Sequence, residues 1–340
     1  MKKASGKVKI IVWIIGILLV CLIFVLYFTQ FYQKKFRIGT GNPGGTYYSY
    51  IKEFSELASS ELNISRVETS GTVASIRLLQ KGFIDGAIVQ NDLLYNASKG
   101  INFFEEENTK DNLAFSAVAG LYTECLQIVT HRDSAIETIE DLKGKRISVG
   151  EDQSGVVLNA ADILDIYGLS FNDVECRYLS YSDSARALAN GEIDAFICMA
   201  GAPTNAITSC AENSDLRILS LDDSDIEKLI SIYPYYVSCT IPAGTYKGIN
   251  EDIPTIGVRA VLVVANNRSQ EEVKILTDDI IKYSEKLNEA IVTDGQLSPE
   301  EAATDIAIPF HSGAASYYND FSITIPVDPN SDSKFLPAQR

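Results

Sequence analysis

Residues 72–90 read TVASIRLLQKGFIDGAIVQ. Apolar side chains recur at helical spacing, a glycine is placed to end the helix, and Ile-Asp then leads into a short apolar run. Residues 182–199, SDSARALANGEIDAFICM, repeat this order, and Asp194 stands where the first copy has Asp85. Short buried strands after helices are typical of parallel β-α-β units. Because a glycine joins helix to strand in many α/β proteins, it is the shared Gly-x-Ile-Asp pattern that predicts two related α/β lobes.

Polar or small residues end both predicted strands. Gln90–Asp92 follow the first strand, and Ala200–Pro203 follow the second. In open α/β sheets, ligands bind beyond the carboxyl ends of the strands. Two such ends that face each other predict a cleft between the lobes.

Two apolar segments are placed to connect the lobes. Cys125–Thr130 is a strand that crosses between them, and Thr255–Val264 is a long strand of return, before a helix from Gln270 to Ala290. The predicted divisions are a membrane segment and linker over 1–36, the first part of lobe one over 37–125, lobe two over 126–245, the return of lobe one over 246–319, and a poorly ordered, Asp-, Ser- and Pro-bearing tail over 320–340.

Residues 37–48, RIGTGNPGGTYY, predict a short strand, a glycine-rich turn and a helix start. Such a turn exposes backbone N–H groups at the positive end of the helix dipole, which suits an anionic group. The stretch contains the G-x-G-x-x-G pattern of dinucleotide sites. Pro43 removes an N–H where a pyrophosphate needs donors, and nicotinamide cofactors are absent outside the membrane. A carboxylate is therefore the expected anion.

The N-terminus carries the apolar run Ile10–Phe28, about the 20 residues that a membrane-spanning helix needs. Four lysines before it predict a cytoplasmic N-terminus and an extracytoplasmic body. A cleaved signal peptide is the alternative, but the run exceeds the usual length and no A-x-A-like site follows. We expect an uncleaved single-pass anchor in the cell membrane.

Charge and motif content exclude several classes of function. The whole chain has a formal net charge of −16, and its N-terminal region is basic, so the body is more acidic still. This argues against binding to nucleic acid or to an anionic membrane face. There is no G-x-S-x-G motif, neither His131 nor His311 has a triad setting, and Asp85 and Asp194 suit structural hydrogen bonds to loop N–H groups. We expect a binding protein, with no enzyme activity and no cofactor.

The cysteines of the body are widely spaced and include no C-x-x-C motif. With two histidines in the chain, a zinc site is not expected, and no other metal site is predicted. Disulfides in an exported protein and buried free thiols both remain open. These cysteines are Cys125, Cys176, Cys198, Cys210 and Cys239.

Hydroxyls, amides and free N–H groups supply the predicted ligand site. Residues 69–72 open one helix and residues 153–155 open another, so three helix starts are expected to converge on the cleft. Arg259 faces either the cleft or solvent, and Tyr233–Tyr236 form either a pocket wall or hinge packing. The predicted ligand-binding residues are Gly44, Gly45, Thr46, Tyr47, Thr69, Ser70, Gly71, Thr72, Gln90, Ser154, Gly155, Gly201, Pro203 and Tyr235.

An ordered series of motifs resembles the TAXI solute receptors of tripartite ATP-independent periplasmic (TRAP) transporters over residues 37–319. The matching segments are Ile38–Tyr48, Thr69–Val73, Val89–Asp92, Leu121–Glu124, Asp141–Gly150, Ser154–Gly155, Gly191–Phe196, Gly201–Pro203, Tyr233–Tyr236, Ile241–Tyr246 and His311–Tyr318. The resemblance implies a two-lobed periplasmic-binding-protein fold of type II that closes on a small carboxylate or amino acid, such as glutamate or 2-oxoglutarate. It also implies delivery to an integral membrane TRAP permease driven by an ion gradient.

The chain departs from that family at two points. The family often has Gly-Ser-Val-Glu-Asn where this chain has Gly71–Ser75, so the ligand can differ. The family's receptors diffuse freely in the periplasm, whereas the expected membrane anchor of this chain suits tethering at the outer face of a single-membrane cell. We expect the lobes to close about the crossing strands near residues 125–130 and 240–262, because only the closed form contacts the ligand from both sides. A membrane-tethered sensor with the same fold, signalling to a membrane partner, is the alternative.

Overall fold

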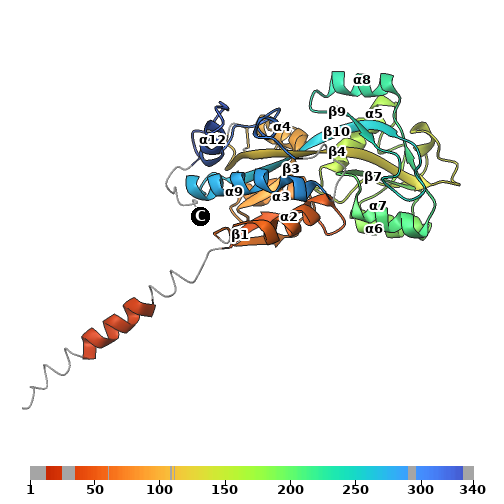
Figure 1. Cartoon of the computed structure of the whole chain (residues 1–340). Coiled ribbons are helices and arrows are strands. Elements are labelled where there is room, and N and C mark those ends of the chain that lie inside the picture. Colours follow the sequence, from red (N-terminus) through yellow and green to blue (C-terminus); the bar gives the residue numbers. More distant parts are fainter. Residues whose placement is uncertain are drawn as a thin grey trace, which may run out of the picture. The chain divides into compact units, whose positions relative to one another are not determined.

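The computed structural model describes residues 13–24, 35–59, 61–107, 109–110, 112–289 and 296–331. The chain divides into two compact units, residues 1–35 and residues 36–340. The second unit, called the body below, is an α/β structure in which helices cover a mixed sheet (Figure 1).

The first unit includes part of the predicted membrane anchor. Of the run Ile10–Phe28, residues 13–24 are helical with exposed side chains, and the two ends of the run lie outside the described residues. Within the described part of the chain, no helix has both the length and the hydropathy to cross a bilayer. The anchor stays a prediction.

The described residues of the body form a ten-stranded sheet in the order β2-β1-β3-β10-β4-β7-β5-β6, with β8 paired to β4 and β9 paired to β10. The strands β2-β1-β3 and β6-β5-β7 are parallel triplets, and the antiparallel pair β4 and β10 lies between them. The strands are β1 (Phe36–Gly39), β2 (Ile64–Val67), β3 (Gly86–Gln90), β4 (Phe115–His131), β5 (Arg146–Ser148), β6 (Glu175–Arg177), β7 (Ala195–Ala200), β8 (Leu216–Leu219), β9 (Val237–Ile241) and β10 (Ile253–Ala265).

The helices of the body pack their apolar faces on this sheet. Two of them begin with a capping box, in which Ser269 and Ser298 exchange hydrogen bonds with the Glu three residues later. The helices are α2 (Thr46–Leu57), α3 (Thr72–Gln80), α4 (Asn91–Lys99), α5 (Val156–Ile166), α6 (Tyr181–Ala189), α7 (Asn205–Asn213), α8 (Asp223–Ile232), α9 (Gln270–Lys282), α10 (Ser284–Asn288), α11 (Pro299–Ala302) and α12 (Ser312–Asn319).

The predicted repeat is present as two copies of one unit. In the first copy, Asp85 precedes β3 and accepts hydrogen bonds from the backbone N and the Nε of Arg37 on β1, both at 2.9 Å. In the second, Asp194 precedes β7 and accepts from the same two atoms of Arg146 on β5, at 2.8 and 3.1 Å. The partners are 48 residues apart in both copies. The structural role predicted for these two aspartates is confirmed, but their partners are arginines on strands instead of the predicted loop N–H groups.

The two lobes have separate hydrophobic cores, and the chain passes between them along β4 and β10. On β4, Tyr122 packs in the first core and Leu126 in the second; on β10, Val258 packs in the second and Ala260 in the first. Figure 1 shows both strands running through the two lobes. The two-lobed α/β fold is thus present. Residues 246–258 correct the predicted division, because their apolar side chains pack with the second lobe.

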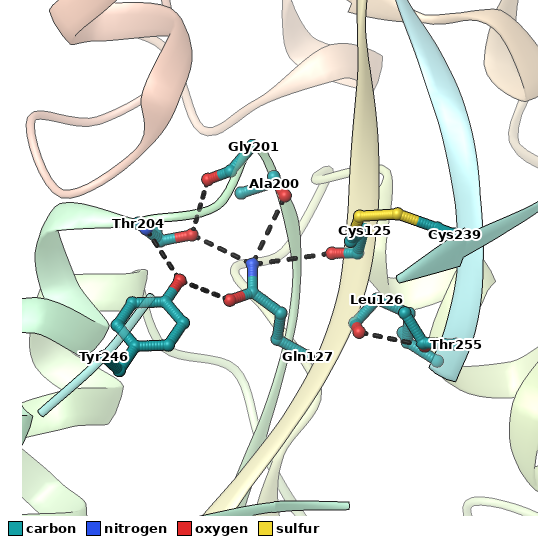
Figure 2. The surroundings of a disulfide bond; sticks show 9 residues. All are labelled: Cys125, Leu126, Gln127, Ala200, Gly201, Thr204, Cys239, Tyr246 and Thr255. Atoms are coloured by element: carbon teal, nitrogen blue, oxygen red, sulfur yellow. Dashed lines mark hydrogen bonds between the residues drawn. A yellow bond between two sulfur atoms is a disulfide. The ribbon is translucent and has the colours of Figure 1, made fainter. Parts of the chain in front are cut away.

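A disulfide joins Cys125 on β4 to Cys239 on β9 (Figure 2). Beside it, the Gln127 amide donates to the Thr204 hydroxyl (3.0 Å) and to the Ala200 carbonyl (3.3 Å). This network fixes the second-lobe end of β4 against the loop after β7. The other described cysteines are free thiols: Cys21, Cys176, Cys198 and Cys210.

The segment after α12 corrects a second expectation. Residues 320–331, expected to be poorly ordered, return to the first lobe, where Phe310 bridges to Val327. Asp328 accepts hydrogen bonds from the Ser116 hydroxyl (3.1 Å) and the Asn266 amide (3.2 Å). These long-range partners hold a sequence whose composition is typical of a loose tail. Residues 332–340 lie outside the described residues.

Candidate ligand-binding site

A cavity of about 50 Å³ lies between the lobes, at the carboxyl ends of the parallel strands. Its walls come from both lobes and from the point where β4 crosses between them. Its lining residues are Thr40, Gly41, Asn42, Gly45, Thr46, Tyr47, Ser70, Gly71, Thr72, Gln90, Glu124, Glu151, Ser154, Gly155, Val156, Ser180, Tyr181, Met199 and Ala200. Most of these side chains are polar, and no Lys or Arg is among those described.

Four helices begin at this cavity, two from each lobe. Gly45, Gly71 and Gly155 are the N-cap residues of α2, α3 and α5, and none of them offers a side-chain hydrogen bond to its helix. Ser180 caps α6 by accepting from the backbone N of Asp183 at 3.2 Å. Among the first N–H groups of α3, that of Ala74 donates to the Gln153 carbonyl of the other lobe at 3.2 Å. The remaining N–H groups of the uncapped helix starts lie at the positive end of the helix dipole, which suits an anionic group. The sequence predicted three such starts; α6 adds a fourth.

The lobes touch each other around the cavity. The Thr46 hydroxyl donates to the Gly201 carbonyl (3.0 Å), and the Gln90 amide donates to Asn159 Oδ1 (3.0 Å). A Cβ placed on Gly155 would overlap Gln90 Oε1. The body is therefore in a closed arrangement, and glycine at position 155 permits the close approach of the lobes.

Two carboxylates line the cavity, and sequence reasoning assigned neither to the site. Glu124 is 2% exposed, and burial raises its pKa well above the usual range. The Tyr47 hydroxyl donates to Glu124 Oε2 at 2.9 Å. Glu151 follows β5 and accepts from the Asn42 amide at 3.5 Å, and burial raises its pKa as well. Glu124 closes one of the quoted motifs, which was the available signal.

Ser154 has a buried hydroxyl that lines the cavity without a hydrogen-bond partner among the described residues. Leaving a buried hydroxyl unpaired costs about 1–3 kcal/mol. A ligand oxygen in the cavity would satisfy it.

The predicted site residues divide into those that line the cavity and those that do not. Gly45, Thr46, Tyr47, Ser70, Gly71, Thr72, Gln90, Ser154 and Gly155 line it. Gly44, Thr69, Gly201, Pro203 and Tyr235 lie outside its lining.

Several of the outer residues support the lining from behind. Thr69 accepts a hydrogen bond from the Gly41 N–H at 3.2 Å and holds the opening loop. The Gly44 carbonyl accepts from the backbone N of Ala206 across the lobes at 3.3 Å. Pro203 follows a cis peptide bond in the loop after β7.

Tyr235 belongs to a polar cluster between the lobes instead. Its hydroxyl and that of Tyr236 donate to Asp162, at 3.3 and 2.8 Å. The Asn159 amide donates to Tyr236 (2.8 Å) and to Asp92 of the first lobe (2.9 Å). Burial raises the pKa of Asp92 to about 7 and that of Asp162 to about 6. Of the two alternatives for the tyrosines, the structure favours packing between the lobes.

Arg259 and the histidines lie away from the cavity. Arg259 on β10 donates to the Glu301 carbonyl at 2.8 Å. His131 contacts the Leu188 carbonyl at 2.9 Å, and His311 caps α12 by accepting from the Gly313 N–H at 3.1 Å. In the part of the chain that the structure describes, no three His, Cys, Asp or Glu side chains gather as metal ligands would. The absence of a metal or cofactor stays a prediction.

Comparison with known proteins identifies the family. A model of the NMT1-like family matches residues 38–320. Solved structures with a similar fold include a protein from Bordetella bronchiseptica RB50 (15% identity, TM-score 0.50, covering 90% of this chain and 86% of that one). The periplasmic aliphatic sulphonate binding protein SsuA from Escherichia coli (17%, 0.44, 85% and 90%) and an ancestral arginine-binding protein bound to arginine (16%, 0.46, 76% and 98%) are also similar. Because the family match takes in well over half of the chain, this protein belongs to the NMT1-like family.

Proposed function

We propose that this protein is an extracytoplasmic solute receptor that closes its two lobes on a small carboxylate or amino acid. The observation that carries the proposal is the convergence of four helix starts, two from each lobe, on one interlobe cavity. Helix N-termini bind anionic groups without a full positive charge. Because the two lobes contribute equally, a ligand held there stabilises the closed form over an open one.

The unpaired Ser154 hydroxyl supports a ligand in the closed form. The hydroxyls and amides around it provide donors and acceptors for a polar molecule, which suits binding without turnover. We therefore propose a binding role and no catalysis, with a ligand of the glutamate or 2-oxoglutarate kind.

The partner is proposed from the motif series rather than from the site. That series favours an ion-gradient-driven TRAP permease as the acceptor of the ligand. The basic, then apolar N-terminus favours a chain held in the cell membrane with its body on the extracytoplasmic side. Co-purification of the full chain with the candidate permease subunit from membranes tests this part; association with an ATP-driven transporter instead would contradict it.

Ligand binding is tested with the purified full chain and a thermal-shift panel of amino acids and dicarboxylates, followed by calorimetry on the hits. A ligand that binds the folded protein raises the melting temperature, and the rise grows with the ratio of the ligand concentration to Kd. Ser154→Ala is expected to weaken binding by about tenfold, because it removes one hydrogen bond to the ligand and none to the described residues of the protein.

Ser184→Ala is the matched control for Ser154→Ala. The Ser184 hydroxyl is buried in the same lobe but donates to Ser148 at 2.7 Å and does not line the cavity. This variant is expected to lose stability while keeping the wild-type Kd. If Ser154→Ala and wild type bind the ligand with equal affinity, the ligand does not bind in this cavity.

A further inference from the structure

This inference rests on the proposed function and narrows its ligand class. We propose that Glu124 binds an ammonium group, so that the receptor takes amino acids and rejects carboxylates that lack the ammonium group. The proposal concerns the part of the ligand that the helix starts do not recognise. It would exclude 2-oxo acids and simple dicarboxylates from the ligands considered above.

Glu124 occupies a fixed position at the centre of the body. It lies on β4 where the strand passes from one lobe to the other, directly opposite Val258 of β10 in the sheet register. Its side chain is 2% exposed, yet it lines the cavity. Because β4 is paired with β10 at this residue, the backbone fixes the face of the sheet from which the Glu124 side chain projects.

Tyr47 orients this carboxylate. Its hydroxyl donates to Oε2 at 2.9 Å, and among the described residues this is the hydrogen bond that Glu124 makes through its side chain. Burial and the nearby Glu124 charge raise the pKa of Tyr47 well above the usual value, so the phenol stays a donor. The second carboxylate oxygen is left for a group inside the cavity.

Among the described residues that line the cavity, no side chain offers a positive charge to Glu124. The titratable groups that act on Glu124 or feel its charge are Tyr47, Tyr122, Tyr181, Cys198 and Asp92, and none of them is basic. A buried carboxylate without a cation is costly and takes up a proton instead. A cationic ligand group would let Glu124 ionise, at the same time as the helix starts hold the ligand carboxylate. A purely anionic ligand would meet Glu124 and Glu151 with no compensating cation.

The experiment compares ligand pairs that differ at one group. Calorimetry on the full chain measures Kd for each amino acid found by the thermal-shift panel and for the 2-oxo acid and the des-amino acid of the same skeleton, for example L-glutamate, 2-oxoglutarate and glutarate. Wild type is expected to bind the amino acid about 10- to 100-fold more tightly, the usual contribution of a hydrogen bond to a charged group. Glu124→Gln is expected to abolish this preference, and Asp279→Asn, which changes a buried carboxylate of α9 outside the cavity lining, to keep it.

Proton release gives a readout that a merely structural role would not change. Repeating the titrations in buffers of different ionisation enthalpy counts protons. Wild type is expected to release up to one proton per amino acid bound near neutral pH, because the ammonium group lets Glu124 ionise, and Glu124→Gln is expected to release fewer. The thermal melting curve of each variant verifies its fold.

The outcomes separate the two proposals. If 2-oxo acids bind wild type as tightly as amino acids, or if Glu124→Gln keeps the preference, the receptor stands and the role of Glu124 is overturned. If no amino acid, 2-oxo acid or dicarboxylate binds wild type at all, the proposed receptor function itself fails.

Discussion

The two lobes share one structural unit but bury it to different depths. In the first lobe, the Asp85 side chain is 7% exposed and also faces Arg268 at 3.5 Å; in the second, the Asp194 side chain is 30% exposed. The paired arginines, Arg37 and Arg146, are equally exposed at 38%. The repeated sequence pattern therefore produces the same Asp–Arg ion pair in both lobes. The surrounding packing decides how much that ion pair contributes to the stability of the fold.

The largest expected effect comes from breaking the ion pair in each lobe. Asp85→Asn is expected to lower the free energy of unfolding by about 3 kcal/mol, because it leaves the buried Arg268 without one of its acidic partners. Asp194→Asn is expected to cost about 1 kcal/mol, as a half-exposed pair does. Urea unfolding of the two variants measures this difference. Equal losses would show that burial does not distinguish the lobes.

An N-cap glycine of the second lobe and one of the first lobe differ in the space around them. Gly155→Ala is expected to weaken ligand binding by about 2 kcal/mol, because its Cβ would overlap Gln90 of the opposite lobe and oppose closure. Gly45→Ala is the control: the nearest atom to its Cβ is 3.6 Å away, and the φ of −97° suits alanine. Calorimetry measures both affinities. A larger loss of affinity in Gly45→Ala than in Gly155→Ala would contradict the role of Gly155 in closure.

A pH series distinguishes the acidic residues that each lobe brings to the polar cluster. Burial raises the pKa of Asp92 to about 7 and of Asp162 to about 6, above the value of about 3.9 in an unfolded chain. The folded protein therefore binds more protons than the unfolded chain. The stabilisation that these two protonated groups contribute is complete below about pH 4 and is lost as pH rises through 6 to 7. Asp92→Asn is expected to remove about 1–2 kcal/mol of that fall, measured by urea unfolding from pH 5 to 8. An unchanged slope would contradict the raised pKa.

The smallest effect concerns two serines at the second-lobe helix starts. Ser180 accepts a hydrogen bond from the α6 backbone, and Ser180→Ala is expected to lower stability by about 1 kcal/mol. Ser154 has no such partner in the described part of the chain, so Ser154→Ala is expected to leave the stability of the ligand-free protein unchanged or slightly raised. Thermal melting without ligand compares them. A larger loss for Ser154→Ala would mean that its hydroxyl serves the fold.

Local sequence patterns predicted the repeat and most of the loops around the cavity. The helix-glycine-strand order of residues 72–90 depends on short-range spacing, and so do the helix starts at Gly71 and Gly155. Because parallel strands bring their carboxyl ends together, these loops follow from the fold class.

The remaining features depend on contacts between distant residues. Glu124 lies within an apolar strand, and its place at the crossing follows only from the pairing of β4 with β10. Tyr235 stands in one of the motifs that resemble those of the TAXI receptors, but its direction is set by Asp162, which lies 73 residues earlier. The order of residues 320–331 depends on Ser116 and Asn266 in the same way. A local sequence pattern does not indicate hydrogen-bond partners that lie this far away in the chain.

Hydrogen exchange of the full chain, with and without the amino acid that binds most tightly, tests the central claim most directly. If the ligand bridges the lobes at the four helix starts, the backbone amides at the beginning of α2, α3, α5 and α6 should all gain protection together. The α12 start, away from the cavity, should stay unchanged. Protection confined to one lobe, or absent from these helix starts while the ligand is bound, would contradict the account.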